Sequence, residues 1–167
     1  MKVIPLYVLA FALAGANLVS AQSSDNHDLE LKACGPKNKE VNYSEKADHK
    51  QHPLPQPDAG KALVYVLRPT KLGFVIQTKV AVDGDWKGVN RGDTYFFFQL
   101  DPGDHAVCSV AENRSVLQLT VAAGKTYYLQ QHIETGMMKA RNEIAPMTED
   151  EAKEKLAKLD LATWQVK

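Results

Sequence analysis

The sequence has no excess of charge of either sign, because twenty lysines and arginines balance twenty aspartates and glutamates. A strongly basic chain would favour nucleic acid or an anionic membrane as its partner, and that signal is missing here. Beyond the N-terminus, no apolar run approaches the roughly 20 residues that a membrane-spanning helix needs. We therefore expect neither nucleic-acid binding nor a mature form that spans a membrane.

Motifs for catalysis, metal binding and cofactors are also missing. The five histidines form no paired ligand motif on an ordered element, whereas a structural zinc site usually needs four ordered ligands. His105 and Cys108 are close in sequence, but on one strand their side chains would face opposite sides. We therefore expect no cofactor, no metal and no enzymatic activity. One alternative stays open, a hydrolase that combines His105 with the carboxylates of turns, which are Asp83, Asp85, Asp93, Asp101 and Asp104.

The N-terminus has the layout of a secretory signal peptide. Met1-Lys2 supplies a positive start, residues 3–19 are almost wholly apolar, and Val19-Ser20-Ala21 places small residues before a cleavage site. This pattern predicts a signal peptide at residues 1–21, cleaved after Ala21, and hence a secreted or periplasmic protein. A transmembrane anchor is the alternative, since about 17 apolar residues lie near the lower limit for crossing a bilayer.

Cysteine is scarce, with Cys34 and Cys108 as the only two. In an oxidising compartment, two cysteines form a disulfide more often than they stay free. We expect this bond to close a loop of about 75 residues and to stabilise the fold by roughly 4 kcal/mol in the chain-entropy model. The alternative is two unpaired cysteines.

Short apolar runs dominate residues 61–146. Clusters of Gly, Pro and Asp separate these runs, which is typical of strands in an antiparallel β-sandwich or a small barrel. Asp83-Gly84 predicts a hairpin, because the tight turn needs positive φ. Pro102-Gly103 fits the centre of a type II turn. The predicted strands are residues 62–67, 75–82, 86–89, 94–100, 105–110, 115–121 and 126–133, with a further short run at 137–144.

An appendage lies on either side of this domain. Residues 22–60 read as an extended, charged and proline-rich arm, because Pro53, Pro55 and Pro57 cannot join a central strand. A connector is the favoured interpretation, and a proline-rich recognition ligand is the alternative. Residues 147–160 read as an amphipathic helix that packs on the domain. Thr148 and Glu151 fit a capping box, and the apolar stripe of this helix is Ala152, Leu156 and Leu159.

With no site chemistry to follow, the sequence predicts a non-catalytic exported domain that binds or supports another component of the envelope or the extracellular space. That partner would be a protein or a glycan. Large aromatic side chains are the candidates for a binding surface, at Trp86, Tyr95, Tyr128 and Trp164. The alternatives are the hydrolase above and a carrier that holds a small ligand in a cavity of the sandwich.

The chain carries a succession of motifs, which are Ala62-Leu63-Val64-Tyr65-Val66, Val82-Asp83-Gly84, Asp101-Pro102-Gly103-Asp104-His105 and Ala123-Gly124-Lys125-Thr126-Tyr127-Tyr128. Their order resembles the bacterial domain-of-unknown-function family 2846, which is found largely in exported proteins and lipoproteins. The resemblance covers about residues 60–135. This part of the chain is also similar to short PEGA-type surface domains. The resemblance implies a β-sandwich at the cell exterior or in the periplasm, with no established activity. Together with the helix predicted from its own residues, we expect an all-β fold with a C-terminal α-helix, built as an antiparallel immunoglobulin-like β-sandwich. No cysteine directly follows the apolar N-terminal stretch, so the resemblance does not extend to a lipid anchor.

Overall fold

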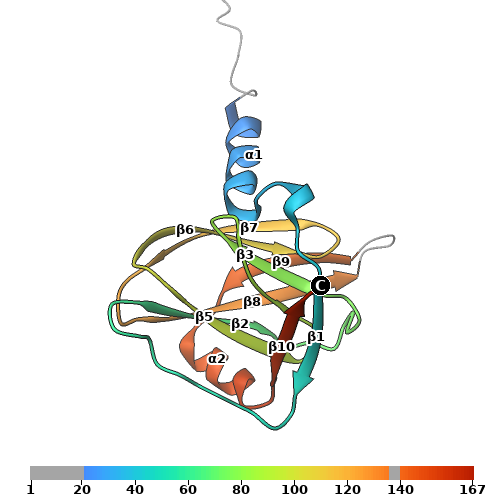
Figure 1. Cartoon of the computed structure of the whole chain (residues 1–167), viewed down its shortest axis with the longest axis vertical. Helices are drawn as coiled ribbons and strands as arrows, with labels where there is room; N and C mark the ends of the chain where they lie inside the picture. The colour runs from blue at the N-terminus through green and yellow to red at the C-terminus, as the bar shows by residue number, and fades with distance from the viewer. Residues whose placement is uncertain (1–20, 136–139) are drawn as a thin grey trace, which may run out of the picture.

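A computed structural model describes residues 21–135 and 140–167, which form two stacked sheets with a helix on each outer side (Figure 1). The predicted signal peptide lies outside the described residues, except for Ala21. Among the described helices, none is long and apolar enough to cross a membrane. The elements are α1 (Ala21–Cys34), η1 (Lys37–Lys39), β1 (Tyr43–Asp48), β2 (Ala62–Arg68), β3 (Thr78–Val82), β4 (Asp85–Asn90), β5 (Thr94–Leu100), β6 (Gly103–Val110), β7 (Arg114–Val121), β8 (Thr126–Thr135), β9 (Ala140–Pro146), α2 (Glu149–Leu156) and β10 (Asp160–Val166).

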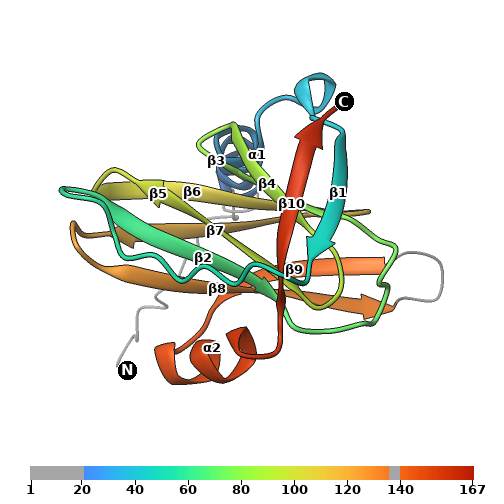
Figure 2. The ribbon, with the colours of Figure 1, turned by 60° about the horizontal axis from the view of Figure 1, so that its bottom comes forward.

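The two sheets are open and face each other, which confirms the predicted β-sandwich. One sheet has six strands in the order β1-β10-β5-β2-β8-β9, and the other has four in the order β4-β3-β6-β7. Most pairs are antiparallel, but β2 pairs with β8 and β5 pairs with β10 in parallel. Figure 2 shows β1 and β10 as a ribbon that runs across the other strands at one end of the sandwich.

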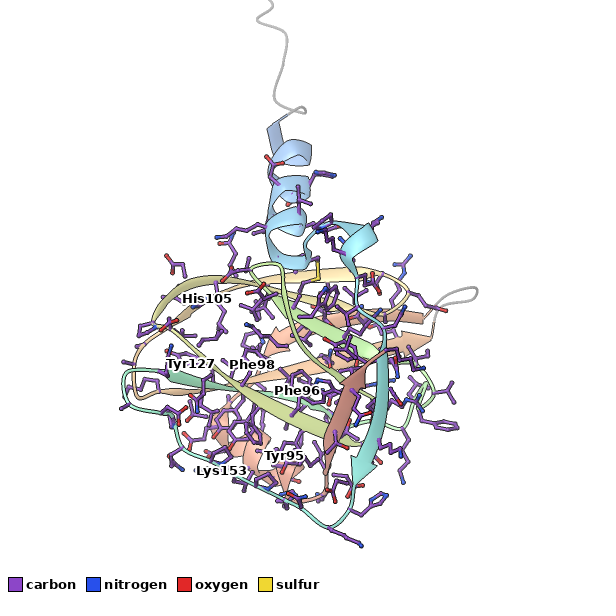
Figure 3. All side chains as sticks on the ribbon, in the orientation of Figure 1. Tyr95, Phe96, Phe98, His105, Tyr127 and Lys153 are labelled. Atoms are coloured by element: carbon purple, nitrogen blue, oxygen red, sulfur yellow. A yellow bond between two sulfur atoms is a disulfide. The ribbon has the colours of Figure 1, made fainter. Side chains whose placement is uncertain are left out.

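Alternation along β2 explains why the six-stranded sheet is apolar on both sides. Val64 and Val66 point into the space between the sheets, while Leu63 and Tyr65 point outward. On the neighbouring β5, Phe96 faces inward and Tyr95 faces α2, as Figure 3 shows. Full burial of such a side chain stabilises the fold by about 1.5–3 kcal/mol. Every residue of β2 is buried, as predicted for a strand that is covered on both faces.

The C-terminal helix α2 confirms the predicted amphipathic helix and its packing on the domain. Thr148 accepts a hydrogen bond from the Glu151 amide, and the Glu151 carboxylate accepts one from the Thr148 amide, so the capping box is complete. Ala152, Leu156 and Leu159 are buried against the outer face of the six-stranded sheet. The helix was predicted over residues 147–160, but it ends at Leu156. The chain then turns and enters β10, a strand that was not predicted.

The predicted extended arm is wrong for much of residues 22–60. α1 packs its C-terminal end, at Ala33 and Cys34, on the outer face of the four-stranded sheet. β1 then joins the six-stranded sheet as an edge strand, in register with β10 from Tyr43 to Asp48. The prolines nevertheless behave as predicted, because no helix or strand lies between Asp48 and Ala62. The arm is therefore part of the sandwich and not a separate connector.

A buried polar network joins the two sheets at the middle of β8. The Gln131 side chain is fully buried, and its Oε1 accepts hydrogen bonds from Thr78 Oγ1 and Asn90 Nδ2, both at 3.0 Å. Its Nε2 donates to Ser109 Oγ at 2.9 Å. Buried polar groups are costly without partners but specify one arrangement when each is bonded. This network fixes the position of β3, which begins at Thr78.

Candidate functional site: an apolar loop held by a buried arginine

The predicted disulfide is confirmed between Cys34 and Cys108, with an S–S distance of 2.03 Å. Both cysteines are buried, together with Ala33 and Ala106. The bond ties the C-terminal end of α1 to β6, and it appears as the yellow link at the base of α1 in Figure 3. Its place in the interior fits a structural bond.

His105, the residue of the hydrolase alternative, has both ring nitrogens engaged. Nδ1 lies 2.6 Å from Asp83 Oδ2, and Nε2 lies 2.8 Å from the Asp101 carbonyl oxygen. Partial burial lowers the pKa of His105, but the hydrogen bonds to these two acceptors raise it more, so the pKa ends above its ordinary value. An imidazole that donates from both nitrogens is protonated and has no lone pair for a general base. This geometry fits a residue that fastens a turn.

Of the turn carboxylates, Asp83 contacts the His105 ring directly, whereas Asp101, Asp104 and Asp93 are bonded to other side chains. Asp104 accepts a hydrogen bond from Thr120 Oγ1 at 2.6 Å, whereas Asp101 pairs with Lys61 at 2.6 Å. Asp93 lies elsewhere and pairs with Lys71. Over residues 21–135 and 140–167, no group of three or more His, Cys, Asp or Glu side chains could hold a metal ion.

The four aromatic residues predicted as a binding surface lie in three different places. Trp86 packs near α1 and donates from Nε1 to the Lys39 carbonyl at 3.2 Å. Tyr95 and Tyr128 share the outer face of the six-stranded sheet, where Tyr95 is fully buried. Trp164 packs against the core between the sheets. These residues therefore do not form one exposed surface.

Exposed apolar side chains gather instead on the connection between β2 and β3, which we call the apolar loop (residues 69–77). Leu72, Phe74 and Val75 are 46%, 65% and 63% exposed, respectively. A strand was predicted to begin at residue 75, but β3 begins only at Thr78. In Figures 1 and 2 the loop lies at the end of the sandwich where β8 ends and β9 begins.

Arg68, the last residue of β2, holds the backbone of the apolar loop. Its side chain is fully buried, and its guanidinium donates to the carbonyl oxygens of Leu72 at 3.1 Å, Gly73 at 2.7 Å and Ile76. Burial lowers the pKa of Arg68 to about 10, which still leaves it charged at neutral pH. The rigid fork of a guanidinium suits this task, because its several N–H groups can reach several carbonyls at once.

Bonds within the apolar loop complete this arrangement. The Leu72 amide donates to Thr70 Oγ1 at 3.1 Å, and the Ile76 amide donates to the Gly73 carbonyl at 2.8 Å. Gly73 has φ of +59°, a conformation that favours glycine. The loop therefore offers apolar side chains to solvent while many of its backbone groups are bonded internally.

Two further contacts support the apolar loop from the turn between β4 and β5. Gly92 lies so close that a Cβ atom there would be 2.7 Å from the Thr70 carbonyl oxygen. Arg91 pairs with Glu45 of β1, with Nε 2.8 Å from Oε2. Burial raises the pKa of Glu45, while Arg91 and Arg68 lower it. Burial has the larger effect, so the pKa of Glu45 ends above its ordinary value, and its carboxyl group lies within electrostatic reach of the buried Arg68.

This site was not predicted from the sequence. Arg68-Pro69-Thr70 reads only as the end of a strand, and arginine after a buried strand is common at the surface. A weak signal is present in Leu72-Gly73-Phe74-Val75, a run of apolar residues around a glycine where a polar turn is expected.

One comparison with known proteins identifies a family. A family model described as "Protein of unknown function (DUF2846)" matches residues 58–143, more than half of the chain. The match includes Arg68, the apolar loop and His105. An uncharacterized protein of Haemophilus influenzae is 23% identical over 107 residues, which are 64% of this chain and 64% of that protein, so this chain spans less than two thirds of that relative. No solved structure matches the chain. By the extent of the family match, the chain belongs to the DUF2846 family.

Proposed function

We propose that this chain is an exported, non-catalytic binding domain that docks on another protein through the apolar loop. The observation that carries the proposal is the exposure of Leu72, Phe74 and Val75 on a loop whose backbone is held by Arg68. Apolar anchors on a pre-arranged backbone lose little conformational entropy on binding, which favours affinity.

Export is supported by the signal-peptide pattern of residues 1–21 and by the disulfide, since disulfides persist in oxidising compartments. The partner is then a protein of the envelope or the extracellular space. A protein groove is favoured over a glycan, because the apolar loop presents apolar side chains and few free polar groups to sugar hydroxyls. The absence of a catalytic role is supported by His105, whose two nitrogens are both engaged.

A photo-crosslinking side chain in place of Phe74 tests the proposal in an envelope extract. We expect a discrete protein adduct from position 74 and none from position 54, where Leu54 is 52% exposed on a different surface. The double variant Phe74→Ser/Val75→Ser should lower capture of that protein by about tenfold, as expected for loss of an interface anchor. Val166→Ser is the matched control, because Val166 is 67% exposed on β10. Equal adducts from positions 74 and 54, or equal capture by both variants, would contradict docking at the loop.

A further inference from the structure

A second candidate surface lies on the outer face of the six-stranded sheet, under a segment of the chain itself. We call residues 52–57 the strap, because they cross this face between β1 and β2 without joining either sheet (Figure 2). Along the strap, Pro53, Pro55 and Pro57 are half-buried, whereas Leu54 and Gln56 are exposed. The strap therefore lies on the sheet with its prolines inward.

The strap is held by side chains of the sheet and not by a strand ladder. Tyr95 Oη donates to the Pro53 carbonyl at 3.1 Å, and Tyr65 Oη donates to the Pro55 carbonyl at 3.0 Å. Gln99 adds a longer hydrogen bond, from its Nε2 to the Gln56 carbonyl at 3.4 Å. The donors stand on neighbouring strands, Tyr65 on β2 and Tyr95 and Gln99 on β5.

Aromatic rings form the floor beneath these bonds. Tyr65 stacks on Tyr128 with ring centroids 5.5 Å apart, and it contacts Phe97 at 5.6 Å. The His52 ring meets Tyr95 edge-on at 5.2 Å. We call Tyr65, Tyr95, Phe97 and Tyr128 the tyrosine face. Burial raises the pKa of Tyr65 and of Tyr95 to about 12, so both hydroxyls stay protonated and available as donors.

This combination is the chemistry by which proteins recognise extended proline-rich peptides. Proline has no amide hydrogen, and an extended proline-rich segment makes no internal hydrogen bonds, so its carbonyls are free to accept. Recognition then comes from aromatic rings that pack on the prolines and from side-chain donors that reach the carbonyls. The tyrosine face supplies both.

We propose that the tyrosine face is a recognition surface for an extended proline-rich peptide of a partner protein, and that the strap occupies it in cis. The occupant is defined by what is seated there now, an alternating Pro-x-Pro-x-Pro segment with its prolines inward and two carbonyls bonded to tyrosine hydroxyls. This surface is separate from the apolar loop, so the inference does not depend on the proposed docking function.

Occupation in cis sets how a partner could bind. A segment joined by a short linker acts at an effective concentration of the order of millimolar. A free peptide that makes only the same contacts therefore cannot displace the strap at micromolar concentration. Weakening the contacts of the strap should leave the tyrosine face free to bind a peptide in solution, and this can be tested directly.

The test measures binding of a fluorescently labelled peptide with the sequence of residues 50–59 by fluorescence anisotropy. The protein is the disulfide-bonded chain from Gln22 onward, with the triple change Pro53→Gly, Pro55→Gly and Pro57→Gly in the strap. We expect this variant to bind the peptide at least about tenfold more tightly than the unchanged protein, because glycine lacks the half-buried ring and the fixed φ of proline. A peptide with its three prolines replaced by alanine is the control and should not bind.

The tyrosine hydroxyls are tested on the same background. Adding Tyr65→Phe and Tyr95→Phe keeps the rings but removes both donors, and should weaken peptide binding by about tenfold or more. The proposal is overturned if the triple variant does not bind the peptide. It is also overturned if the affinity for the peptide is unchanged when Tyr65→Phe and Tyr95→Phe are added. Dimerisation of the triple variant without peptide binding also overturns it, since the occupant would then be a second copy of this chain. If the triple variant does not fold, the same measurements on a chain cleaved between Asp58 and Ala59 decide, because Cys34–Cys108 keeps the two pieces together.

Discussion

Replacing Arg68 with methionine removes the clamp on the apolar loop while keeping most of the side-chain volume. Three carbonyl acceptors lose their donor, those of Leu72, Gly73 and Ile76. A hydrogen bond to a charged group contributes about 1.5–3 kcal/mol, and Glu45 also loses a nearby positive charge. Part of this loss is recovered, because a surface loop can move and hydrate its carbonyls. We therefore expect the free energy of unfolding to fall by about 3–5 kcal/mol, as for other broken buried charge contacts.

Urea unfolding of the oxidised protein, followed by circular dichroism, measures this loss. The matched control is Arg141→Met, because Arg141 is exposed on β9 and its replacement should change the free energy of unfolding by no more than about 0.5 kcal/mol. Arg68→Lys should restore only part of the stability, since a single ammonium cannot reach three carbonyls with the geometry of a guanidinium.

Hydrogen exchange separates a local effect from a global one. The amides of Leu72 and Ile76 are bonded within the apolar loop, so both should exchange faster in Arg68→Met even where the strands remain protected. A change in unfolding free energy below about 1 kcal/mol, together with unchanged exchange at these two amides, would refute the role assigned to Arg68.

Three other changes test separate parts of the fold. Replacing both Cys34 and Cys108 with serine should lower the free energy of unfolding by roughly 4 kcal/mol, because the bond joins residues 74 apart in sequence; urea unfolding with and without reductant measures it. Gly88→Ala should cost about 1–3 kcal/mol, since a Cβ there would lie 2.7 Å from the Trp164 ring, and a changed tryptophan fluorescence spectrum should accompany the loss. The raised pKa of His105 means that its contribution is fully present below its ordinary pKa of about 6.5 and is lost as the pH rises through the folded value. Stability should therefore fall from pH 6.5 upward in the unchanged protein but not in His105→Gln, and equal slopes in the two would contradict this.

Local signals were enough to predict most strands. β5 begins and ends where its aromatic run does, at Thr94 and Leu100, because each side chain of that run can be buried on one face or the other. The Asp83-Gly84 hairpin is present, with φ of 52° and 85°. These features depend on neighbours within a few residues, and sequence patterns record such neighbours directly.

Elements held by distant partners could not be predicted in the same way. β1 reads Tyr-Ser-Glu-Lys-Ala-Asp and has little apolar pattern, but it becomes a strand by pairing with β10, more than 100 residues later. α1 is not amphipathic along its length, and its position depends on the bond from Cys34 to β6. The same limit applies to Arg68, whose role depends on the path of the apolar loop around it. A residue type alone does not reveal which carbonyls it will meet.

The apolar loop is exposed, whereas the apolar outer faces of the two sheets are covered by other parts of the described chain. α1 packs on one sheet, and α2 and the strap cover the other. Sheets lie about 10 Å apart, so three or four extended residues could carry the chain from β2 to β3. The loop instead has nine residues, and it requires Gly73 in a left-handed conformation and the burial of a charged arginine, which is costly. A connection that served only to join two strands would need none of these features. Their combined effect is to fix Leu72, Phe74 and Val75 in solvent, which is why we place docking there and not at His105, where the polar groups are already bonded to one another.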